Sequence, residues 1–363
     1  MNERWLVAMS GGVDSSVAAA LLARSGAEVL GVTMDLGEGS SKDHAVPGSK
    51  KCCGLPDAED AAAVARRMGF RHYVANYRRA FDQAVVQPFV EAYAAGETPI
   101  PCSACNRVLK FDHLLRRARA LGARGVATGH YARIVRDAEG RLGLYRARDR
   151  LKDQTYFIFD IPARNLEELS FPLGDLHKEQ VREVARELEL PTADKPESQG
   201  ICFVPDGDVR SALERLRPGL RASAGEIVDP LGRVLGRHSG TAGYTVGQRK
   251  GLGLSGGPWY VREIQTERNR LVVSRDSAAL RLRRLRVRET SWLVGGLPED
   301  EVRVQVRHRQ APVRARLRPG AHPGEIEVEL AEPVWAPSPG QAAVVYDAAD
   351  ERVLGGGWIA GAR

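Results

Sequence analysis

The stretch RWLVAMSGGVDSSVAAALLARSG, residues 4–26, contains the pattern that decides the fold of the first half of the chain. Its apolar start, residues 4–9, predicts a short buried strand, and its Ala- and Leu-rich end, residues 17–26, predicts a helix closed by Gly26. Between them lies the polar turn SGGVDSS, residues 10–16. A strand, a glycine turn and a helix in this order predict an α/β sheet with the turn at the carboxyl end of a strand.

The same alternation continues for much of the chain. Further strands are expected at residues 27–34, 72–77 and 124–129, and further helices at 57–69, 81–96, 106–122 and 167–191. Loops are expected at 37–56 and 193–204. Strands separated by crossover helices indicate a doubly wound parallel sheet, on which ligands bind at the carboxyl ends of the strands.

The pattern changes beyond about residue 215, where short alternating apolar runs are separated by Gly and Pro. Such runs predict antiparallel strands in small β domains. We therefore expect an α/β catalytic domain over residues 1–210, a β-rich central domain over 211–280 and a C-terminal β-barrel over 281–363.

Composition limits the class of protein. The 363 residues are 43% hydrophobic and 27% charged, as in soluble globular proteins, and no apolar run is long enough to predict a membrane span. No secretory leader is expected. Five unevenly spaced cysteines indicate reduced thiols in the cytoplasm and not a disulfide framework.

Positive charge is concentrated near the end of the chain. The net charge is +7, and the run RLRRLRVR, residues 281–288, is followed by Arg303, Arg307, Arg309, Arg314, Arg316 and Arg318. Alternation with Leu and Val places many of these arginines on one sheet face, where they would bind RNA phosphates. A solvated strand face is the alternative.

The SGGVDSS turn has the chemistry of an anion site. Gly11 and Gly12 allow a close approach of the backbone, and the N–H groups at the start of the following helix attract phosphate. Asp14 fits beside phosphates as a Mg²⁺ ligand or through water. The Gly-Lys-Ser/Thr ending of the Walker loop is absent, and an ordinary helix-capping turn is the alternative.

A second motif, TPIPCSACN at residues 98–106, contains Cys102 and Cys105. The spacing suits half a zinc site, a redox couple or a reactive thiol with a distant partner. Zinc would need a second pair, and the adjacent Cys52 and Cys53 lack the usual spacing. Their default interpretation is that of loop thiols.

The SGGVDSS turn resembles the PP-loop of the ATP pyrophosphatase superfamily, whose members split ATP to AMP and pyrophosphate while adenylating a substrate oxygen. Beyond it, the chain resembles the bacterial tRNA-specific 2-thiouridylase family nearly from end to end. The stretches that carry this resemblance are TPIPCSACNRVLKF (98–111), ATGHYAR (127–133), LKDQTYF (151–157), ESQGICF (197–203), YTVGQRKGLG (244–253), PWYV (258–261), RHRQ (307–310) and PGQAAVVY (339–346).

This resemblance implies three sets of site residues. Those expected to bind ATP are Ala8, Met9, Ser10, Gly11, Gly12, Val13, Asp14, Ser15, Met34 and Gly129. Those expected to border the target base or contact tRNA are Ile100, Pro101, Cys102, His130, Lys152, Asp153, Gln154, Arg307, His308 and Gln341. The catalytic candidates are Asp14, Cys105 and Cys202.

The resemblance also implies the partners. They are ATP with Mg²⁺, the tRNAs for Lys, Glu and Gln modified at the wobble uridine, and a sulfur-carrier or persulfide donor protein. A membrane partner is not expected.

The residue types suit sulfur transfer. Adenylation of the uracil C2 oxygen makes it a leaving group, which a persulfide on Cys202 can displace. Cys105 can then break the S–S bond by thiol–disulfide exchange and form a disulfide with Cys202. Arg107, Lys110 and the expected helix start at 106 predict a favoured Cys105 thiolate. Taken alone, Cys202 between Ile201 and Phe203 would be interpreted as a small buried apolar residue.

The chain departs from the commoner form of the family at Cys102, where that form has aspartate. Cys102, Cys105 and Cys202 could together hold a [4Fe–4S] cluster whose open iron binds hydrosulfide. We prefer the persulfide route and keep the cluster as the alternative. His113 is expected to be a packing or surface residue, and His44 and His72 belong to no motif.

Two other classes of function remain at this point. One is an ATP-pyrophosphatase amide ligase with a small-molecule substrate, which gives Cys105 and Cys202 no role. The other is an RNA-binding protein with an inactive loop, which would release no AMP in response to tRNA.

Overall fold

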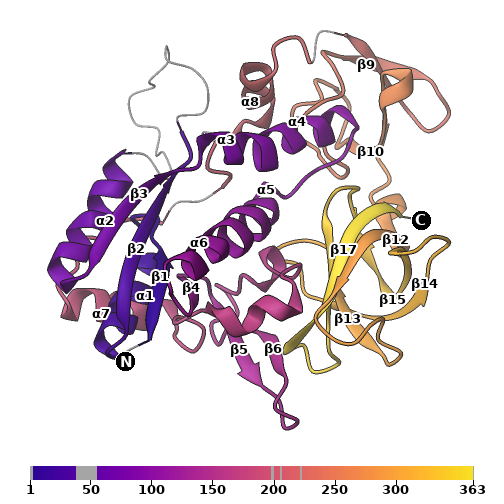
Figure 1. The fold of residues 1–363 in the computed structure, drawn as a ribbon. Helices are drawn as coiled ribbons and strands as arrows, with labels where there is room; N and C mark the ends of the chain where they lie inside the picture. Colours follow the sequence, from indigo (N-terminus) through magenta and orange to yellow (C-terminus); the bar gives the residue numbers. More distant parts are fainter. Residues whose placement is uncertain (1–2, 38–54, 198–199, 205–206, 221–222, 363) are drawn as a thin grey trace. The chain divides into compact units, whose positions relative to one another are not determined.

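The computed structural model describes residues 3–37, 55–197, 200–204, 207–220 and 223–362 (Figure 1). His44, Cys52 and Cys53 lie outside the described residues. The chain forms two compact units. The first comprises residues 1–85, 102–207 and 351–353, and the second comprises 86–101, 208–350 and 354–363. The division into domains at 210 and 280 stays a prediction.

The first unit is built on a parallel sheet, as the alternating pattern predicted. Its strand order is β3-β2-β1-β4-β7, with β1 in the middle. The strands are β1 Arg4–Ala8, β2 Glu28–Asp35, β3 Arg71–Asn76, β4 Gly125–Thr128 and β7 Leu169–Ser170. All five run parallel. The inner strands β1, β2 and β4 are apolar and buried along most of their length, as in a sheet covered on both faces, whereas the edge strand β3 is mostly exposed.

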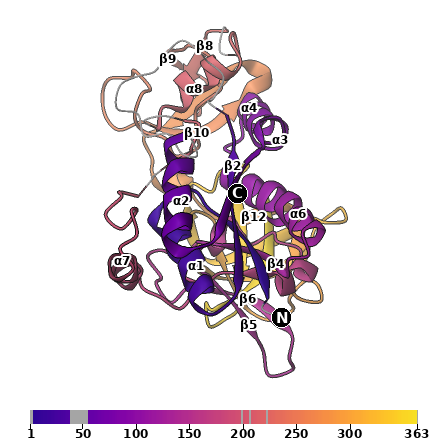
Figure 2. The same cartoon turned by 60° about the vertical axis from the view of Figure 1, so that its left-hand side comes forward.

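Helices connect these strands. They are α1 Val13–Arg24, α2 Leu55–Met68, α3 Arg78–Phe81, α5 Pro101–Ala104, α6 Leu114–Ala120 and α7 Lys178–Glu187, with the wide π-helical turns η1 Asp82–Val86 and η2 Cys105–His113. The short 3₁₀ turns η3 Thr155–Phe157 and η4 Ala163–Glu168 complete the unit. Helices α1 and α2 lie on the opposite side of the sheet from α6 (Figure 2).

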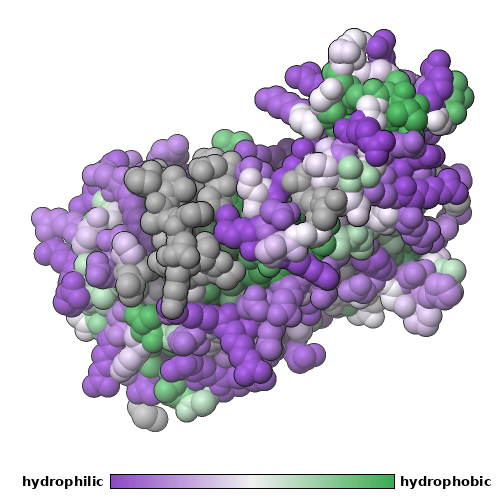
Figure 3. Space-filling model, turned by 90° about the horizontal axis from the view of Figure 1, so that it is seen from above, coloured by the Kyte–Doolittle hydropathy of each residue, from purple (hydrophilic) through white to green (hydrophobic). Residues whose placement is uncertain are grey.

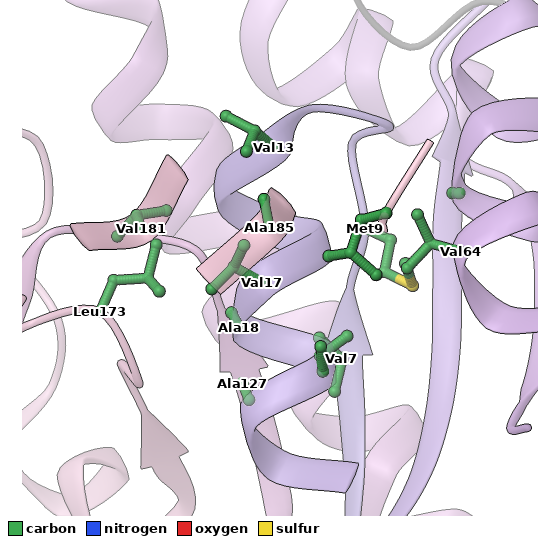
Figure 4. Packing of buried hydrophobic residues seen from close by; sticks show 14 of the residues in the cluster. Val7, Met9, Val13, Val17, Ala18, Val64, Ala127, Leu173, Val181 and Ala185 are labelled. Carbon is green, nitrogen blue, oxygen red and sulfur yellow. The ribbon is translucent and has the colours of Figure 1, made fainter. Parts of the chain in front are cut away.

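The main core of the first unit lies between the sheet and the helices α1, α2 and α7. Val7 on β1, Val17 and Ala18 on α1, and Val181 on α7 are buried in one cluster (Figure 4). The small alanine side chains of α1 allow it to lie close to both the sheet and α7. This packing fixes the loop between β1 and α1 at the carboxyl edge of the sheet.

Two helix starts differ from the sequence prediction. Helix α1 begins at Val13 and not at residue 17, because Ser16 hydrogen-bonds Gly12 O through both its N–H (3.2 Å) and its Oγ (2.8 Å). The helix expected at 106 already begins at Pro101, the residue type favoured in a first helical turn. Cys105 is therefore inside the helical run and not at its N-terminus.

A hairpin of the first unit was not predicted. Strands β5 Ala132–Arg136 and β6 Leu142–Arg146 pair antiparallel, and β6 also pairs with Arg352 and Val353. The single helical unit expected at 167–191 is likewise divided, because strand β7 precedes α7.

The second unit contains two β structures, a short helix and the helix α4 Gln87–Ala94. A four-stranded sheet has the order β10-β11-β8-β9, formed by β8 Gly225–Val228, β9 Val234–His238, β10 Tyr260–Gln265 and β11 Arg270–Ser274, and α8 Val209–Leu216 precedes it. The expectation of purely antiparallel strands was wrong for one pair, since β8 and β11 run parallel. Strands β9 and β10 lie between β8 and β11 in the chain, so β8 and β11 are not joined by a hairpin and can pair in parallel.

The other β structure is a closed antiparallel barrel of order β12-β15-β14-β13-β16-β17, which the pairing of β12 with β17 completes. Its strands are β12 Arg281–Trp292, β13 Val302–Gln305, β14 Val313–Pro319, β15 Ile326–Trp335, β16 Ala342–Tyr346 and β17 Arg352–Ala362. The 3₁₀ turns η6 Thr266–Arg268 and η7 Ala278–Leu280 lie before β11 and β12. The predicted C-terminal β-barrel is confirmed.

In the described ranges, the chain has no helix with the length and apolar character needed to cross a membrane. Hydrophilic residues dominate the described part of the face in Figure 3, and apolar residues form small groups there.

Candidate active site

The loop between β1 and α1 needs glycine at Gly11 for two reasons. Its φ is +70°, and a Cβ there would lie 2.2 Å from the Asp57 carbonyl oxygen. Lys195 Nζ also donates a 3.0 Å hydrogen bond to Gly11 O. The loop backbone is thus held tightly against the first turn of α2.

Serine hydroxyls stabilise the shape of this loop. Ser15 Oγ donates to Gly12 O at 3.2 Å and accepts a hydrogen bond from Ser10 N at 3.1 Å. Ser15 and Ser16 are buried, whereas Ser10 is exposed. The hydroxyls of Ser15 and Ser16 both donate hydrogen bonds to Gly12 O within the loop.

Gly129, directly after β4, touches the same helical turn. A Cβ on Gly129 would lie 2.7 Å from both Asp14 C and Ser15 N. Met34 is buried near the end of β2, and Met9 is buried at the end of β1. The residues that the sequence assigned to ATP therefore gather at the carboxyl ends of adjacent strands.

Asp14 belongs to a polar network that the sequence did not predict. Lys178 Nζ donates to Asp14 Oδ1 at 2.6 Å, and the Tyr131 hydroxyl donates to the same oxygen at 2.8 Å. Glu197 accepts from Lys178 and from Lys152, each at 2.7 Å. Four separate segments thus meet at the first turn of α1.

The network shifts the protonation of its members. Burial opposes ionisation of Glu197, but hydrogen bonds from Lys152 and Lys178 outweigh it and lower the Glu197 pKa to about 2. Burial and the nearby Asp14 carboxylate raise the pKa of Tyr131, so its hydroxyl stays a donor. Two ammonium groups and two carboxylates therefore balance one another beside the loop.

A second lysine supports the loop from the α2 side. Lys195 Nζ lies 2.6 Å from both Asp57 Oδ1 and Asp60 Oδ2. Burial alone would lower the Lys195 pKa, but these two hydrogen-bonded carboxylates raise it. Asp57 lies inside the first turn of α2. Lys195 stays cationic while bonding Gly11 O.

The described cysteines differ in exposure. Cys105 is a free, half-buried thiol, Cys102 is half-buried and Cys202 is exposed. Phe203, next to Cys202, is buried, and its ring lies 5.6 Å from that of Phe81. The exposed position of Cys202 excludes the interpretation of a small buried apolar residue.

The expectation of a favoured Cys105 thiolate was wrong. Burial raises the pKa of the Cys105 thiol, and the positive charge of Lys110 only partly offsets this. The helix N-terminus expected to assist ionisation lies earlier, at Pro101.

No three His, Cys, Asp or Glu side chains of the described residues are grouped so that they could hold one metal ion. Cys102, Cys105 and Cys202 therefore form no such single-ion site, and the iron–sulfur cluster stays the alternative prediction. A single carboxylate such as Asp14 does fit Mg²⁺ at a phosphate site, where the ion keeps waters and phosphate oxygens as its other ligands.

The segment that carries Cys105 is held by its neighbours. Asn106 Nδ2 donates to Phe157 O at 3.0 Å, and Arg107 Nε lies 3.2 Å from Asp160 Oδ2. Burial raises the pKa of Asp160 to about 6 despite the charge of Arg107. Both carboxylate oxygens of Asp160 are buried without a hydrogen-bond partner among the described atoms.

Two of the expected tRNA-contacting residues in the first unit are buried. His130 Nδ1 lies 2.6 Å from Thr128 Oγ1, and burial and then the charge of Lys110 lower its pKa well below the usual value. Asp153 accepts a 2.7 Å hydrogen bond from Arg146.

The neighbours of Asp153 bond within the same network. Gln154 Oε1 accepts a 2.9 Å hydrogen bond from the N–H of Tyr131, while Lys152 reaches Glu197. The segment 152–154 is thereby joined to the Asp14 network.

Among the expected tRNA residues of the second unit, Gln341 and Arg307 both donate hydrogen bonds to backbone carbonyls. Gln341 Nε2 donates to Thr98 O at 2.8 Å, and Ile100 is buried. Arg307 donates to Val246 O (3.0 Å) and Ala336 O (2.8 Å), and His308 is exposed. Arg307 thus joins a loop of the four-stranded sheet to the barrel.

Several arginines of the basic barrel run have carboxylate partners. Arg284 and Arg318 approach Glu329 at 3.5 and 3.8 Å, and Arg288 lies 2.9 Å from Glu97. These contacts favour the solvated-face interpretation for these three arginines.

Sequence reasoning missed Tyr131, Lys178, Lys195 and Glu197. Tyr131 and Glu197 stand inside ATGHYAR and ESQGICF, so the motifs marked their neighbourhood. Their contacts span long separations in the chain, such as 117 residues for Tyr131 with Asp14 and 164 for Lys178 with Asp14. No local pattern carries that information.

Comparisons with known proteins cover nearly the whole chain. Three family models match: a tRNA methyl transferase HUP domain at residues 3–206, a tRNA methyl transferase PRC-barrel domain at 214–275 and an aminomethyltransferase beta-barrel domain at 282–359.

Relatives that align with nearly the full length of the chain are identical to it at nearly half of the aligned positions. The tRNA-specific 2-thiouridylase MnmA of Rhodospirillum rubrum is 47% identical over 372 residues, covering 99% of this chain and 97% of that protein. Those of a Bradyrhizobium species and of Rhizorhabdus wittichii are each 48% identical, over 369 and 360 residues, covering 99% and 98% of this chain and 91% of each relative. The chain belongs to the tRNA-specific 2-thiouridylase MnmA family.

Proposed function

We propose that the protein is a tRNA-uridine 2-sulfurtransferase. It adenylates the C2 oxygen of a tRNA uridine with ATP and replaces that oxygen by sulfur, giving 2-thiouridine, AMP and pyrophosphate. The observation that carries this proposal is the placement of a glycine phosphate loop, Cys105 and an exposed Cys202 in one compact unit of a chain from this family.

In this proposal, ATP binds at the carboxyl ends of β1, β2 and β4. Residues Ala8 to Ser15 hold the phosphates, and Met34 and Gly129 border the nucleotide. Asp14 holds Mg²⁺, which supplies charge neutralisation on the phosphates. Lys178 is then released from Asp14 to bind a phosphate oxygen, because a lysine ammonium is a suitable point charge for this purpose.

Sulfur transfer follows the adenylation. The terminal sulfur of a Cys202 persulfide attacks C2 of the activated uridine, the C2–O bond breaks and AMP leaves. The Cys105 thiolate attacks Cys202 Sγ, the S–S bond to the transferred sulfur breaks, and that electron pair stays on the 2-thiouridine sulfur. The products include a Cys105–Cys202 disulfide, which an external dithiol reduces before the next turnover.

We propose the persulfide route and derive no step through an iron–sulfur cluster. Cys102 then occupies the place of aspartate in the commoner form of the family and is not required as a ligand. A donor protein of the cytoplasm supplies the persulfide sulfur.

The tRNA is proposed to contact both units. Residues 100–102 border the target base, and Lys152, Gln154, Arg307, His308 and Gln341 contact the tRNA. His130 and Asp153 are buried, so their proposed role is to position the segments around them. The proposed target is the wobble uridine of the tRNAs for Lys, Glu and Gln. The proposed domain boundaries are residues 210 and 280.

The test is AMP release together with nucleoside analysis. Purified protein, ATP, Mg²⁺ and unmodified tRNA transcript for lysine are incubated with a persulfide donor. The expected result is tRNA-stimulated AMP release and 2-thiouridine by mass spectrometry. ATP-dependent amidation by a Cys105→Ser/Cys202→Ser variant, or AMP release that ignores tRNA, would contradict the proposal.

A further inference from the structure

The four-stranded sheet of the second unit carries a cavity that no step above uses. It lies in the segment before β10, has a volume of about 430 Å³ and is lined by Arg249, residues 251–254 and residues 257–259. The segment is drawn in orange before β10 in Figure 1. This volume falls in the range of about 300–1,000 Å³ that is usual for small-molecule sites.

Trp259, which lines the cavity, has an arginine over its indole ring. The Arg275 guanidinium carbon lies 4.6 Å from the Trp259 ring centroid. Trp259 is itself fixed, because its Nε1 donates to Ser255 O at 3.0 Å and its ring packs against the core of the sheet. Arg275 thus has a rigid aromatic support.

Two glycines make room for this arrangement. Gly256 and Gly257 have φ values of +79° and +128°. A Cβ at Gly256 would lie 2.9 Å from Arg275 Nη2, and one at Gly257 would lie 3.7 Å from Arg275 Nε. Any larger residue at Gly256 would displace the guanidinium, so the backbone here is shaped around Arg275.

The charges at the cavity are not neutralised by the protein. Arg249, Lys250 and Arg275 are exposed, and none of them takes part in an ion pair within the ranges that the structure describes. In the same sheet, Arg233 and Arg270 do have partners, Asp229 and Glu226. Arg249 lines the cavity, Lys250 is its neighbour in the chain and Arg275 lies over Trp259 of the cavity wall. Cations without carboxylate partners in this arrangement indicate an anionic ligand.

We infer that this cavity binds one unpaired nucleotide of the tRNA. The base stacks on the Arg275 guanidinium, supported by Trp259, and its flanking phosphates are bound by Arg249 and Lys250. Arginine planes and aromatic rings are the usual supports for splayed bases in RNA recognition. The inference rests on the proposed function, since it names a second contact of the same substrate.

The test compares two charge-matched double variants of the full chain. Arg249→Gln/Lys250→Gln removes the lining cation Arg249 and its neighbour in the chain, and Arg262→Gln/Arg268→Gln removes two exposed cations on β10 and the turn η6. Dissociation constants for an unmodified tRNA transcript are measured at several salt concentrations. The cavity variant should bind about tenfold more weakly, and its salt slope should fall by about one per lost phosphate contact. Equal losses in the two double variants would overturn the inference.

Stacking is tested by Arg275→Leu and Arg275→Lys. Because lysine keeps the charge but lacks the plane, both should weaken tRNA binding by about tenfold, within the range for loss of one stacked base. Unfolding temperatures establish that the variants fold. Wild-type affinity for tRNA in both variants would overturn the inference. It would not affect the proposed function, which is tested by 2-thiouridine formation in the wild type.

A protein ligand is the competing explanation, and the same variants exclude or establish it. If they bind tRNA normally and thiolate it with sulfide, but fail with a persulfide donor protein, the cavity serves that protein and the inference is wrong.

Discussion

Lys178 Nζ lies 2.6 Å from Asp14 Oδ1, so the carboxylate of the phosphate loop is bonded to a lysine. Lys178 is buried, and it also pairs with Glu197 at 2.7 Å. Two carboxylates, those of Asp14 and Glu197, therefore hold the ammonium group of Lys178 beside the loop. If Mg²⁺ took Asp14 as a ligand, as we propose, the same lysine would be in place for a phosphate oxygen.

Removal of the Lys178 cation should slow adenylation strongly. Lys178→Met is expected to lower the rate of tRNA-dependent AMP release by about 10²- to 10³-fold, the loss typical of one charge-stabilising group. It should also destabilise the fold by about 3 kcal/mol, because it leaves two partly buried carboxylates without their partner. Chemical unfolding and AMP release measure the two effects.

A double variant separates stability from chemistry. Lys178→Met/Glu197→Gln removes one positive and one negative charge and should recover most of the lost stability, yet it should remain inactive. Recovery of AMP release in the double variant would contradict a phosphate role for Lys178.

Glycine substitutions test the geometry of the loop. Gly11→Ala places a methyl group 2.2 Å from Asp57 O, and Gly129→Ala places one 2.7 Å from Asp14 C. Both should weaken ATP binding at least tenfold. Gly26→Ala is the matched control for Gly11, since it shares a positive φ but has no atom within 4 Å. Calorimetric titration with ATP should show near-normal affinity for the control only.

Asp160 predicts a specific pH dependence of stability. Its pKa rises to about 6 in the folded protein from an ordinary value of 3.8. Because the folded protein binds this proton more tightly than the unfolded chain does, the protonated carboxyl of Asp160 stabilises the fold. This stabilisation is fully present below pH 3.8 and is lost as the pH rises through 6. Asp160→Asn should therefore gain about 2 kcal/mol relative to the wild type between pH 4 and pH 8. A stability difference that stays constant over this range would show that Asp160 does not titrate as described.

The Cys105 thiol predicts an alkaline rise in activity. Because burial raises its pKa, the single-turnover transfer rate should increase with pH above neutrality. Lys110→Met removes the opposing charge and should shift this rise to higher pH, whereas Arg116→Gln, on the surface of α6, should not. An identical profile for Lys110→Met would mean that another group limits the rate.

The sequence predicted the parallel sheet because β1 and β2 are continuous apolar runs, each followed along the chain by a helix. It missed the hairpin β5–β6, whose strands are short and contain charged residues at Arg133 and Arg136. Helix starts were misplaced at Val13 and Pro101, since hydrogen bonds of Ser16 and the conformation of proline decide them locally.

For the site, motifs located the loop, Gly129 and the cysteines, because each belongs to a short pattern. The Lys178–Asp14–Glu197 contacts could not be predicted, since they join segments that only the folded sheet brings together. The thiolate expectation for Cys105 failed for a related reason. Burial depends on tertiary packing, and here it outweighs the charges near Cys105 in sequence.

The central claim is that sulfur on Cys202 reaches an ATP-activated uridine with the help of Cys105. The most direct test is a single turnover with iron-free protein whose Cys202 carries a ³⁴S-labelled persulfide, mixed with unmodified tRNA. With ATP, the label should appear in 2-thiouridine together with one Cys105–Cys202 disulfide, and Cys105→Ser should instead trap tRNA as a dithiothreitol-sensitive adduct on Cys202. Transfer that needs iron, or that proceeds without ATP, would contradict the account.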